Sequence, residues 1–101
     1  MGRRVILTPE AQADLIQIYN YVEEQSGQLT AHSYVQRITD CCEGLADFPE
    51  RGTLRDELFP GLRVIGFDRR VAIAFHVTDD AVIIDRVLYG GRDLEGIFSE
   101  D

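Results

Sequence analysis

The chain has 101 residues and a formal net charge of −8 at pH 7, with 18 acidic and 10 basic residues. This length is typical of one domain, so we expect a single domain over residues 1–101. All ten basic residues are arginines, and the isoelectric point near 4.6 means that the field of the whole molecule repels phosphate backbones. The composition therefore disfavours a general nucleic-acid-binding protein.

The sequence predicts a cytoplasmic protein with no membrane association. No apolar run approaches the roughly 20 residues that a membrane-spanning helix needs. The apolar run before Thr8 has only three residues, Val5 to Leu7, whereas a signal peptide has an apolar stretch of about 7–15 residues. The two cysteines, Cys41 and Cys42, are neighbours, and a disulfide between adjacent helical residues would be badly strained. Two reduced cysteines fit the cytoplasm.

A short strand over residues 3–7 is followed by a first helix. Thr8 supplies an N-cap hydroxyl, Pro9 suits the first helical position and Glu10 places an acid in the first turn. Gly27 is the expected end of this helix. Its apolar residues recur at helical spacing, and we expect its acidic residues, which lie off this stripe, to be solvated. The stripe consists of Ala11, Leu15, Ile18 and Val22.

A second helix is predicted to begin near Thr30 and to close at Pro49. Its apolar residues alternate spacings of three and four, which could also mark a dimerisation seam. Two helices joined by a short glycine-containing loop are better explained as an antiparallel hairpin. The predicted buried stripe is Ala31, Tyr34, Ile38, Cys41, Leu45 and Phe48.

Three β-rich runs follow, over residues 62–67, 70–77 and 81–89, with turn signals at 68–69 and 79–80. The middle run alternates between large apolar residues on one face and Arg70, Ala72, Ala74 and His76 on the other. Short loops make these strands an antiparallel meander. We expect an α+β fold in the order β-α-α-β-β-β, with the helical hairpin packed on one face of an antiparallel-type sheet and the other face partly open.

No phosphate loop, nucleophile motif or metal-ligand spacing occurs, so no cofactor and no metal site are predicted. His32 reads as a solvated helix residue. The chemistry that remains is a set of arginines on the sheet near Tyr89, suited to binding carboxylates or phosphates but poor at proton transfer. They could equally form surface salt bridges with Asp68, Asp79, Asp85 and Asp93. These arginines are Arg63, Arg69, Arg70, Arg86 and Arg92.

Four short motifs occur in order along residues 4–93. They are Leu7-Thr8-Pro9-Glu10-Ala11 with Asp14-Leu15, Ile18 and Tyr21; Leu45-Ala46-Asp47-Phe48-Pro49-Glu50-Arg51-Gly52; Pro60-Gly61-Leu62-Arg63; and Val82-Ile83-Ile84-Asp85-Arg86-Val87-Leu88-Tyr89-Gly90-Gly91-Arg92-Asp93. Together these motifs resemble the ParE/RelE superfamily of toxins from type II toxin–antitoxin systems. Residues 94–101 form an acidic tail outside the resemblance.

The resemblance implies the toxin half of a two-protein module, neutralised by a ParD-like antitoxin with which it would form a hetero-oligomer. ParE-like members are associated with poisoning DNA gyrase, whereas RelE-like members cut mRNA on the ribosome. The net charge, the missing lysines and the closing Gly91-Arg92-Asp93 favour the ParE branch, with no direct contact to nucleic acid. Tyr89 stands where the ParE pattern usually has histidine, which keeps nuclease chemistry open.

Three functions therefore compete. The first is a toxin that binds gyrase or another replication target and has no catalytic residues. The second is a ribosome-dependent endoribonuclease with Arg63, Arg86 and Tyr89 at the scissile phosphate. The third is a non-toxic binding module. For the antitoxin or the target we predict a basic–apolar groove over the open side of the sheet and the edge of the helical hairpin. Small side chains leave room there, and arginines can pair with acidic residues of the partner. The predicted contact residues are Arg63, Arg69, Arg70, Ala72, Ala74, His76 and Arg92.

Overall fold

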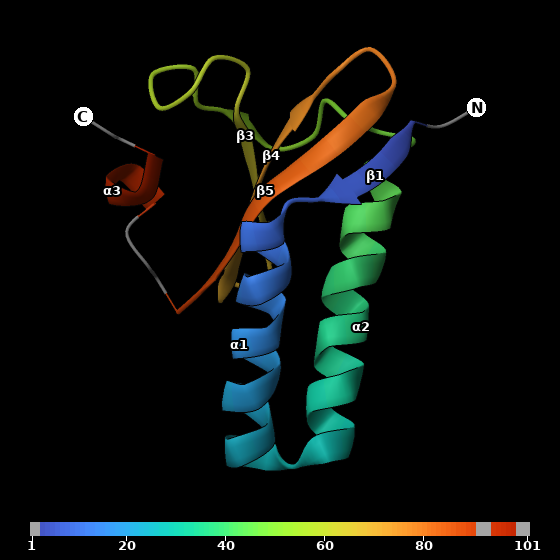
Figure 1. Ribbon diagram of the computed structural model, residues 1–101, viewed down its shortest axis with the longest axis vertical. Helices are drawn as coiled ribbons and strands as arrows, with labels where there is room; N and C mark the ends of the chain where they lie inside the picture. Colours follow the sequence, from blue (N-terminus) through green and yellow to red (C-terminus); the bar gives the residue numbers. More distant parts are fainter. Residues whose placement is uncertain (1–2, 91–93, 99–101) are drawn as a thin grey trace.

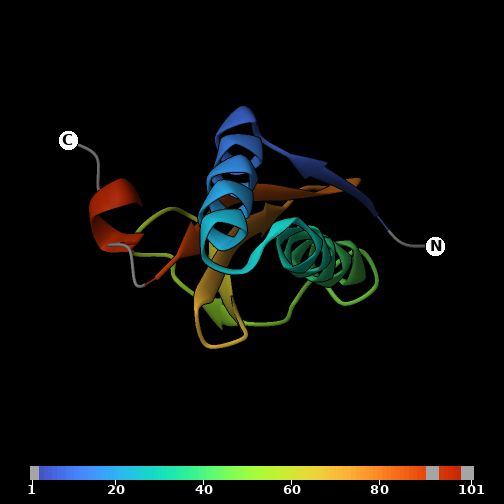
Figure 2. The same cartoon turned by 90° about the horizontal axis from the view of Figure 1, so that it is seen from below.

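The computed structural model describes residues 3–90 and 94–98, and it has two layers: a five-stranded sheet and a helical hairpin on one of its faces (Figures 1 and 2). The predicted α+β class and the succession of strand, two helices and three strands are confirmed. The structure also contains a two-residue strand and a short last helix that were not predicted. The elements are β1 (Arg4–Leu7), α1 (Pro9–Ser26), α2 (Gln28–Gly44), β2 (Thr53–Leu54), β3 (Arg63–Phe67), β4 (Val71–Val77), β5 (Ala81–Tyr89) and α3 (Leu94–Phe98).

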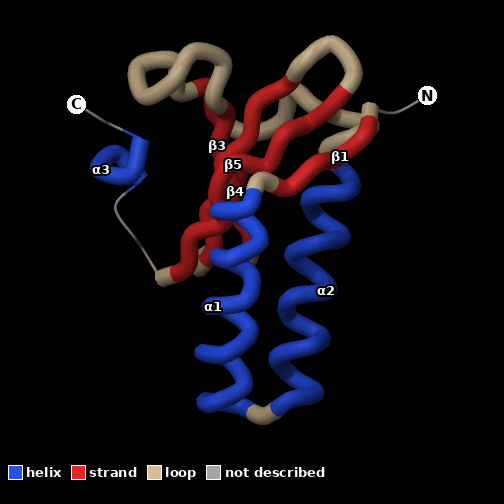
Figure 3. The backbone as a smooth tube through the Cα atoms, in the orientation of Figure 1, coloured by secondary structure: helices blue, strands red, loops and turns tan. Residues whose placement is uncertain are grey.

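The strands lie in the order β1-β5-β4-β3-β2. Figure 3 shows the strands in red and the two long helices of the hairpin in blue. The predicted antiparallel meander of β3, β4 and β5 is confirmed. The sheet as a whole is mixed, because β1 lies at its edge and runs parallel to β5, with Arg4 opposite Ala81 and Leu7 opposite Ile84. No local pattern specifies the direction of β1, because its partner, β5, lies more than 70 residues farther along the chain.

Helix α1 begins as predicted, with the Thr8 hydroxyl accepting a hydrogen bond from the Ala11 N–H at 3.0 Å. Its buried face contains Ala11, Ile18 and Val22 from the predicted stripe. It also contains Asp14, whose side chain is only 5% exposed. The expectation that every acid on this helix is solvated is therefore wrong for Asp14.

Helix α2 begins at Gln28, directly after Gly27, and ends at Gly44. The predicted end at Pro49 is wrong, because the chain leaves the helix in a turn after residue 44 and the helical phase is lost. Phe48 is consequently 66% exposed, not buried. Within the helix Cys42 is fully buried and Cys41 only half-buried, which reverses the predicted order.

The helix-facing side of β4 carries Val71, Ile73 and Phe75, which pack with α1 and α2 in one core, as the alternation predicted. The opposite side is less open than predicted. Ala74 is completely buried there and Ala72 half-buried. The segment that follows β2 lies over this side, since the ring of Phe59 packs edge-on against His76.

Among the described residues, no helix is long and apolar enough to cross a membrane.

Candidate interaction site between α1 and β5

Asp14, on α1, forms hydrogen bonds to β5 just beyond the end of β1. Strand β1 ends opposite Ile84, whereas β5 continues to Tyr89. The Asp14 carboxylate accepts hydrogen bonds from Arg86 Nε at 2.7 Å and Nη2 at 2.8 Å, and from the backbone N–H of Val87 at 2.9 Å. This pairing raises the pKa of the Arg86 guanidinium. The carboxylate therefore occupies a position that a neighbouring strand would otherwise take.

Beyond Asp14, three tyrosines gather at the end of β5. The ring centroids of Tyr21 and Tyr89 are 5.4 Å apart, and those of Tyr34 and Tyr89 are 6.2 Å apart. The neighbouring Tyr89 hydroxyl raises the pKa of Arg70, chiefly by hydrogen bonding. Burial, with the negative charge of Asp68 nearby, raises the pKa of Tyr34 to about 12. The Tyr34 hydroxyl is buried and has no hydrogen-bond partner within the described part of the chain.

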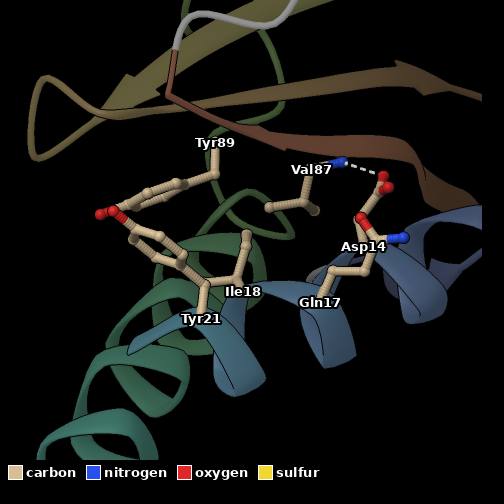
Figure 4. A pocket seen from close by; sticks show the side chains of 6 residues that line it. All are labelled: Asp14, Gln17, Ile18, Tyr21, Val87 and Tyr89. Carbon is tan, nitrogen blue, oxygen red and sulfur yellow. Dashed lines mark hydrogen bonds between the residues drawn. The ribbon is translucent and has the colours of Figure 1, made fainter. Parts of the chain in front are cut away.

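These residues line two pockets that share Tyr21 and Tyr89, and we call the pair the α1–β5 groove. The first pocket, of about 180 Å³, lies beside the edge of β5 (Figure 4). The second, of about 380 Å³, lies between the helical hairpin and the β3–β4 turn. The first is lined by Asp14, Gln17, Ile18, Tyr21, Val87 and Tyr89, and the second by Tyr21, Val22, Gln25, Ser26, Tyr34, Asp68, Arg70 and Tyr89.

The three residues proposed for RNA cleavage each contact a different part of the molecule. Arg86 is held by Asp14, and Tyr89 lies in the tyrosine cluster. Arg63 donates to the backbone carbonyl of Glu50 at 2.9 Å. The predicted surface salt bridges also differ from those observed, because the acid that pairs with Arg86 comes from α1.

His76 has a partner that sequence reasoning missed. Its Nδ1 lies 2.7 Å from a carboxylate oxygen of Asp85. Burial raises the pKa of Asp85, and the hydrogen bond from His76 opposes that shift. The pairing of β4 with β5 skips Asp85, since Ile84 lies opposite Phe75 and Arg86 lies opposite Ala74, so Asp85 is the extra residue of a β-bulge. The predicted turn at 79–80 sets the pairing of His76 with Ile83, but it gives no sign of this bulge.

The remaining predicted contact residues are scattered. Arg70 lines the α1–β5 groove, and Arg69 is exposed at the β3–β4 turn. Ala72 and Ala74 lie on the opposite side of the sheet, where Ala74 is buried. Arg92 lies outside the described residues. A groove at the edge of the helical hairpin was predicted, but of the predicted contact residues only Arg70 lines the α1–β5 groove.

The comparisons with known proteins agree with this architecture. A family model described as the ParE toxin of the type II toxin–antitoxin system parDE matches residues 5–94. The chain belongs to the ParE toxin family. It is 32% identical to Toxin ParE3 of Caulobacter vibrioides over 94 residues, which cover 93% of this chain and 92% of that protein. It is 28% identical to Toxin ParE1 of Mycobacterium tuberculosis over 96 residues, covering 94% and 97%.

A solved structure of the chromosomal ParDE system from P. aeruginosa has the same fold as this ParE-family chain. The TM-score is 0.76 at 26% identity, and the match covers 88% of this chain and 97% of the other. The resemblance to ParE-type toxins that the four sequence motifs indicated is thereby confirmed.

Proposed function

We propose that this ParE-family toxin inhibits growth by binding a replication target such as DNA gyrase, and that a cognate ParD-like antitoxin neutralises it. The observation that carries the proposal is the family match over residues 5–94. The similarity to a ParDE system from P. aeruginosa supports an antitoxin as the partner.

The contacts of the arginines support inhibition by binding. Cleavage of RNA needs one group that takes a proton from a 2′-hydroxyl and another that protonates the leaving oxygen. Arg86 would have to abandon Asp14, and so leave a buried carboxylate unpaired, before it could hold a phosphate. The net charge of −8 opposes docking on ribosomal RNA.

One observation favours the endoribonuclease as a second candidate. Asp85 orients the imidazole of His76 through Nδ1, which is an arrangement used in general acid–base catalysis. The ring of Phe59, with its centroid 5.3 Å from that of His76, restricts access to this pair. We therefore rank RNA cleavage below target binding.

A supercoiling assay tests the proposal. Purified toxin added to DNA gyrase should inhibit supercoiling, and an equimolar amount of the protein encoded by the adjacent reading frame should restore it. Unchanged supercoiling at high toxin excess would exclude gyrase as the target. Cleavage of mRNA on purified ribosomes would support the second candidate. Sustained normal growth after expression without the antitoxin would favour a non-toxic binding module.

A further inference from the structure

The loop over residues 47–51, between α2 and β2, exposes an aromatic side chain, and we call it the Phe48 loop. It lies at the end of α2 beside β1, away from the tip of the hairpin (Figure 1). Phe48 is 66% exposed. Together with the rest of the loop it lines a pocket of about 360 Å³. No residue of this loop lines the α1–β5 groove.

Hydrogen bonds on both sides of Phe48 hold the backbone to neighbouring strands. The carbonyl of Ala46 accepts one from the backbone N–H of Arg3, just before β1, at 3.3 Å. The carbonyl of Glu50 accepts another from Nη1 of Arg63, the first residue of β3, at 2.9 Å. The backbone on each side of the aromatic ring is therefore held from outside the loop.

The residues that follow Phe48 restrict the loop further. Pro49 has a fixed φ, because its ring includes the backbone nitrogen. At Gly52, directly after the loop, a Cβ would lie 2.5 Å from the carbonyl oxygen of Val64, so the backbone passes in close contact with β3. A loop held in this way loses little conformational entropy on binding. It therefore presents Phe48 on a preorganised backbone, as suits an aromatic residue at the core of an interface.

The charges of the Phe48 loop indicate the chemistry of its partner. Asp47, Glu50 and Arg51 are exposed, and none of the three forms an ion pair with the residues that the structure describes. Arg3, which adjoins the loop, donates from Nε to a carbonyl of the β4–β5 turn at 3.2 Å. Two acids and one arginine thus flank the ring. Across an interface, such carboxylates are matched by lysine or arginine side chains.

The net charge of −8 distinguishes the candidate partners of this loop. Two copies of the chain repel each other, which opposes self-association. A protein that handles DNA has positively charged surfaces that hold the phosphate backbone, and such a surface attracts an acidic protein. The proposed replication target belongs to this class, so the field of the toxin favours the target as the occupant.

We propose that the Phe48 loop is the part of this toxin that binds its replication target. The ring of Phe48 enters an apolar socket of the target, and Asp47 and Glu50 face lysine or arginine residues at the rim of that socket. The inference rests on the proposed function, because it names the surface through which the toxin acts. It also separates the target-binding residues from those that line the α1–β5 groove.

Inhibition of supercoiling by purified DNA gyrase tests the inference with three forms of the full toxin. Phe48→Ala removes the ring and should raise the toxin concentration that halves supercoiling by about tenfold or more. Leu29→Ala is the control, because Leu29 is 87% exposed at the start of α2 and lies outside the Phe48 loop. It should change this concentration by less than about twofold, as truncations away from an interface do. Equal effects of the two variants overturn the inference.

A charge variant provides a second measurement that leaves the ring in place. Asp47→Asn combined with Glu50→Gln should weaken inhibition and reduce its dependence on salt, because two charge pairs with the target are lost. Inhibition with unchanged strength and unchanged salt dependence would contradict the acidic contacts of the loop.

Two further measurements distinguish the other occupants. Phe48→Ala should bind the protein of the adjacent reading frame as tightly as the unmodified chain does, since the ring lies outside the α1–β5 groove. Weaker binding of that protein would assign the loop to the antitoxin and overturn the inference. Loss of a toxin dimer in analytical ultracentrifugation of Phe48→Ala would assign the loop to a second copy of this chain, with the same consequence.

The behaviour of the unmodified toxin keeps the inference and the proposed function apart. If it leaves supercoiling unchanged, gyrase is excluded as the target, and growth after induction at matched levels of soluble protein decides the inference instead. Phe48→Ala should then inhibit growth less than Leu29→Ala does. Equal growth inhibition by these variants overturns the inference and leaves the toxin activity standing. Normal growth with the unmodified chain contradicts the proposed function, and the inference with it.

Discussion

The carboxylate of Asp14 and the guanidinium of Arg86 form two hydrogen bonds, of 2.7 and 2.8 Å, between residues 72 positions apart. Asp14 is 5% exposed and Arg86 20% exposed, so water has little access to the carboxylate in this pair. It joins the first helix to the last strand, and the α1–β5 groove begins beside it.

Asp14→Ala should therefore destabilise the fold severely. The substitution leaves the Arg86 charge and the Val87 N–H without their acceptor, and breaking a buried pair typically costs about 3–5 kcal/mol. Urea denaturation measures the change in the free energy of unfolding. Asp47→Ala, at an exposed acid, is the control and should stay within about 0.5 kcal/mol. A loss below about 1 kcal/mol for Asp14→Ala would show that water readily replaces the carboxylate.

Arg69→Gly should stabilise the chain. Asp68 and Arg69 form the β3–β4 turn with φ of 56° and 60°, a left-handed conformation that glycine adopts without strain. Removing this strain should add about 1 kcal/mol, which raises the melting temperature by roughly 4–8 °C in a domain of this size. Differential scanning calorimetry measures it. Asp68→Gly should gain less, since aspartate tolerates this conformation better. A melting temperature lowered by Arg69→Gly would mean that the arginine side chain stabilises the turn.

Two glycine variants separate backbone strain from steric overlap. A Cβ on Gly52, at φ +83°, would lie 2.5 Å from the carbonyl oxygen of Val64. On Gly27, at φ +95°, it would meet nothing within 4 Å. Gly52→Ala should thus cost about 3 kcal/mol, and Gly27→Ala about 1 kcal/mol. Comparable costs in urea denaturation would show that the segment at Gly52 shifts to accommodate the methyl group.

The free energy of unfolding should decrease as the pH rises above 9, because the thiol of Cys42 is buried. Burial raises the pKa of its thiol from 9.0 to about 12. The unfolded thiol thus releases its proton from about pH 9 upward while the folded one retains it. The contribution of Cys42 is complete below pH 9 and declines by about 1.4 kcal/mol per pH unit up to about pH 12.

Urea denaturation at pH 8 and pH 10 under reducing conditions measures this decline. Cys42→Ala should make it shallower, whatever the variant costs at neutral pH. Cys41→Ala, at the half-buried neighbour, should keep the full pH dependence. Parallel pH profiles of Cys42→Ala and the unmodified chain would show that this thiol is not responsible.

Tyr89→Phe should leave growth inhibition largely intact. The ring keeps its packing against Tyr21 and Tyr34, and only the hydroxyl beside Arg70 is lost. Growth after induction, at matched levels of soluble protein, measures the effect. An endoribonuclease that depends on this hydroxyl should instead lose activity by about a hundredfold or more. Loss of toxicity with an unchanged melting temperature would therefore contradict the target-binding proposal.

Much of the fold could be predicted because its signals are local. The Thr8-Pro9 start of α1, the alternation along β4 and the turn at Asp68-Arg69 depend on neighbouring residues, and the structure confirms them. The end of α2 was wrong because apolar spacing continues to Phe48 after the backbone has left the helix.

The candidate site depended on contacts between distant residues. Asp14 looks like any acid on an amphipathic helix until β5 brings Arg86 and the Val87 N–H to it. Likewise β1 pairs with the first part of the β5 edge and Asp14 bonds to Val87 farther along it, although no residue near β1 or Asp14 indicates a shared strand.

By itself the sequence determined the elements, the core faces and the ParE resemblance, because periodicity and caps act over a few residues. Only the tertiary structure decided which charges are buried and, among residues 3–90 and 94–98, how far β1 covers the edge of β5, because both depend on pairing between the two ends of the chain.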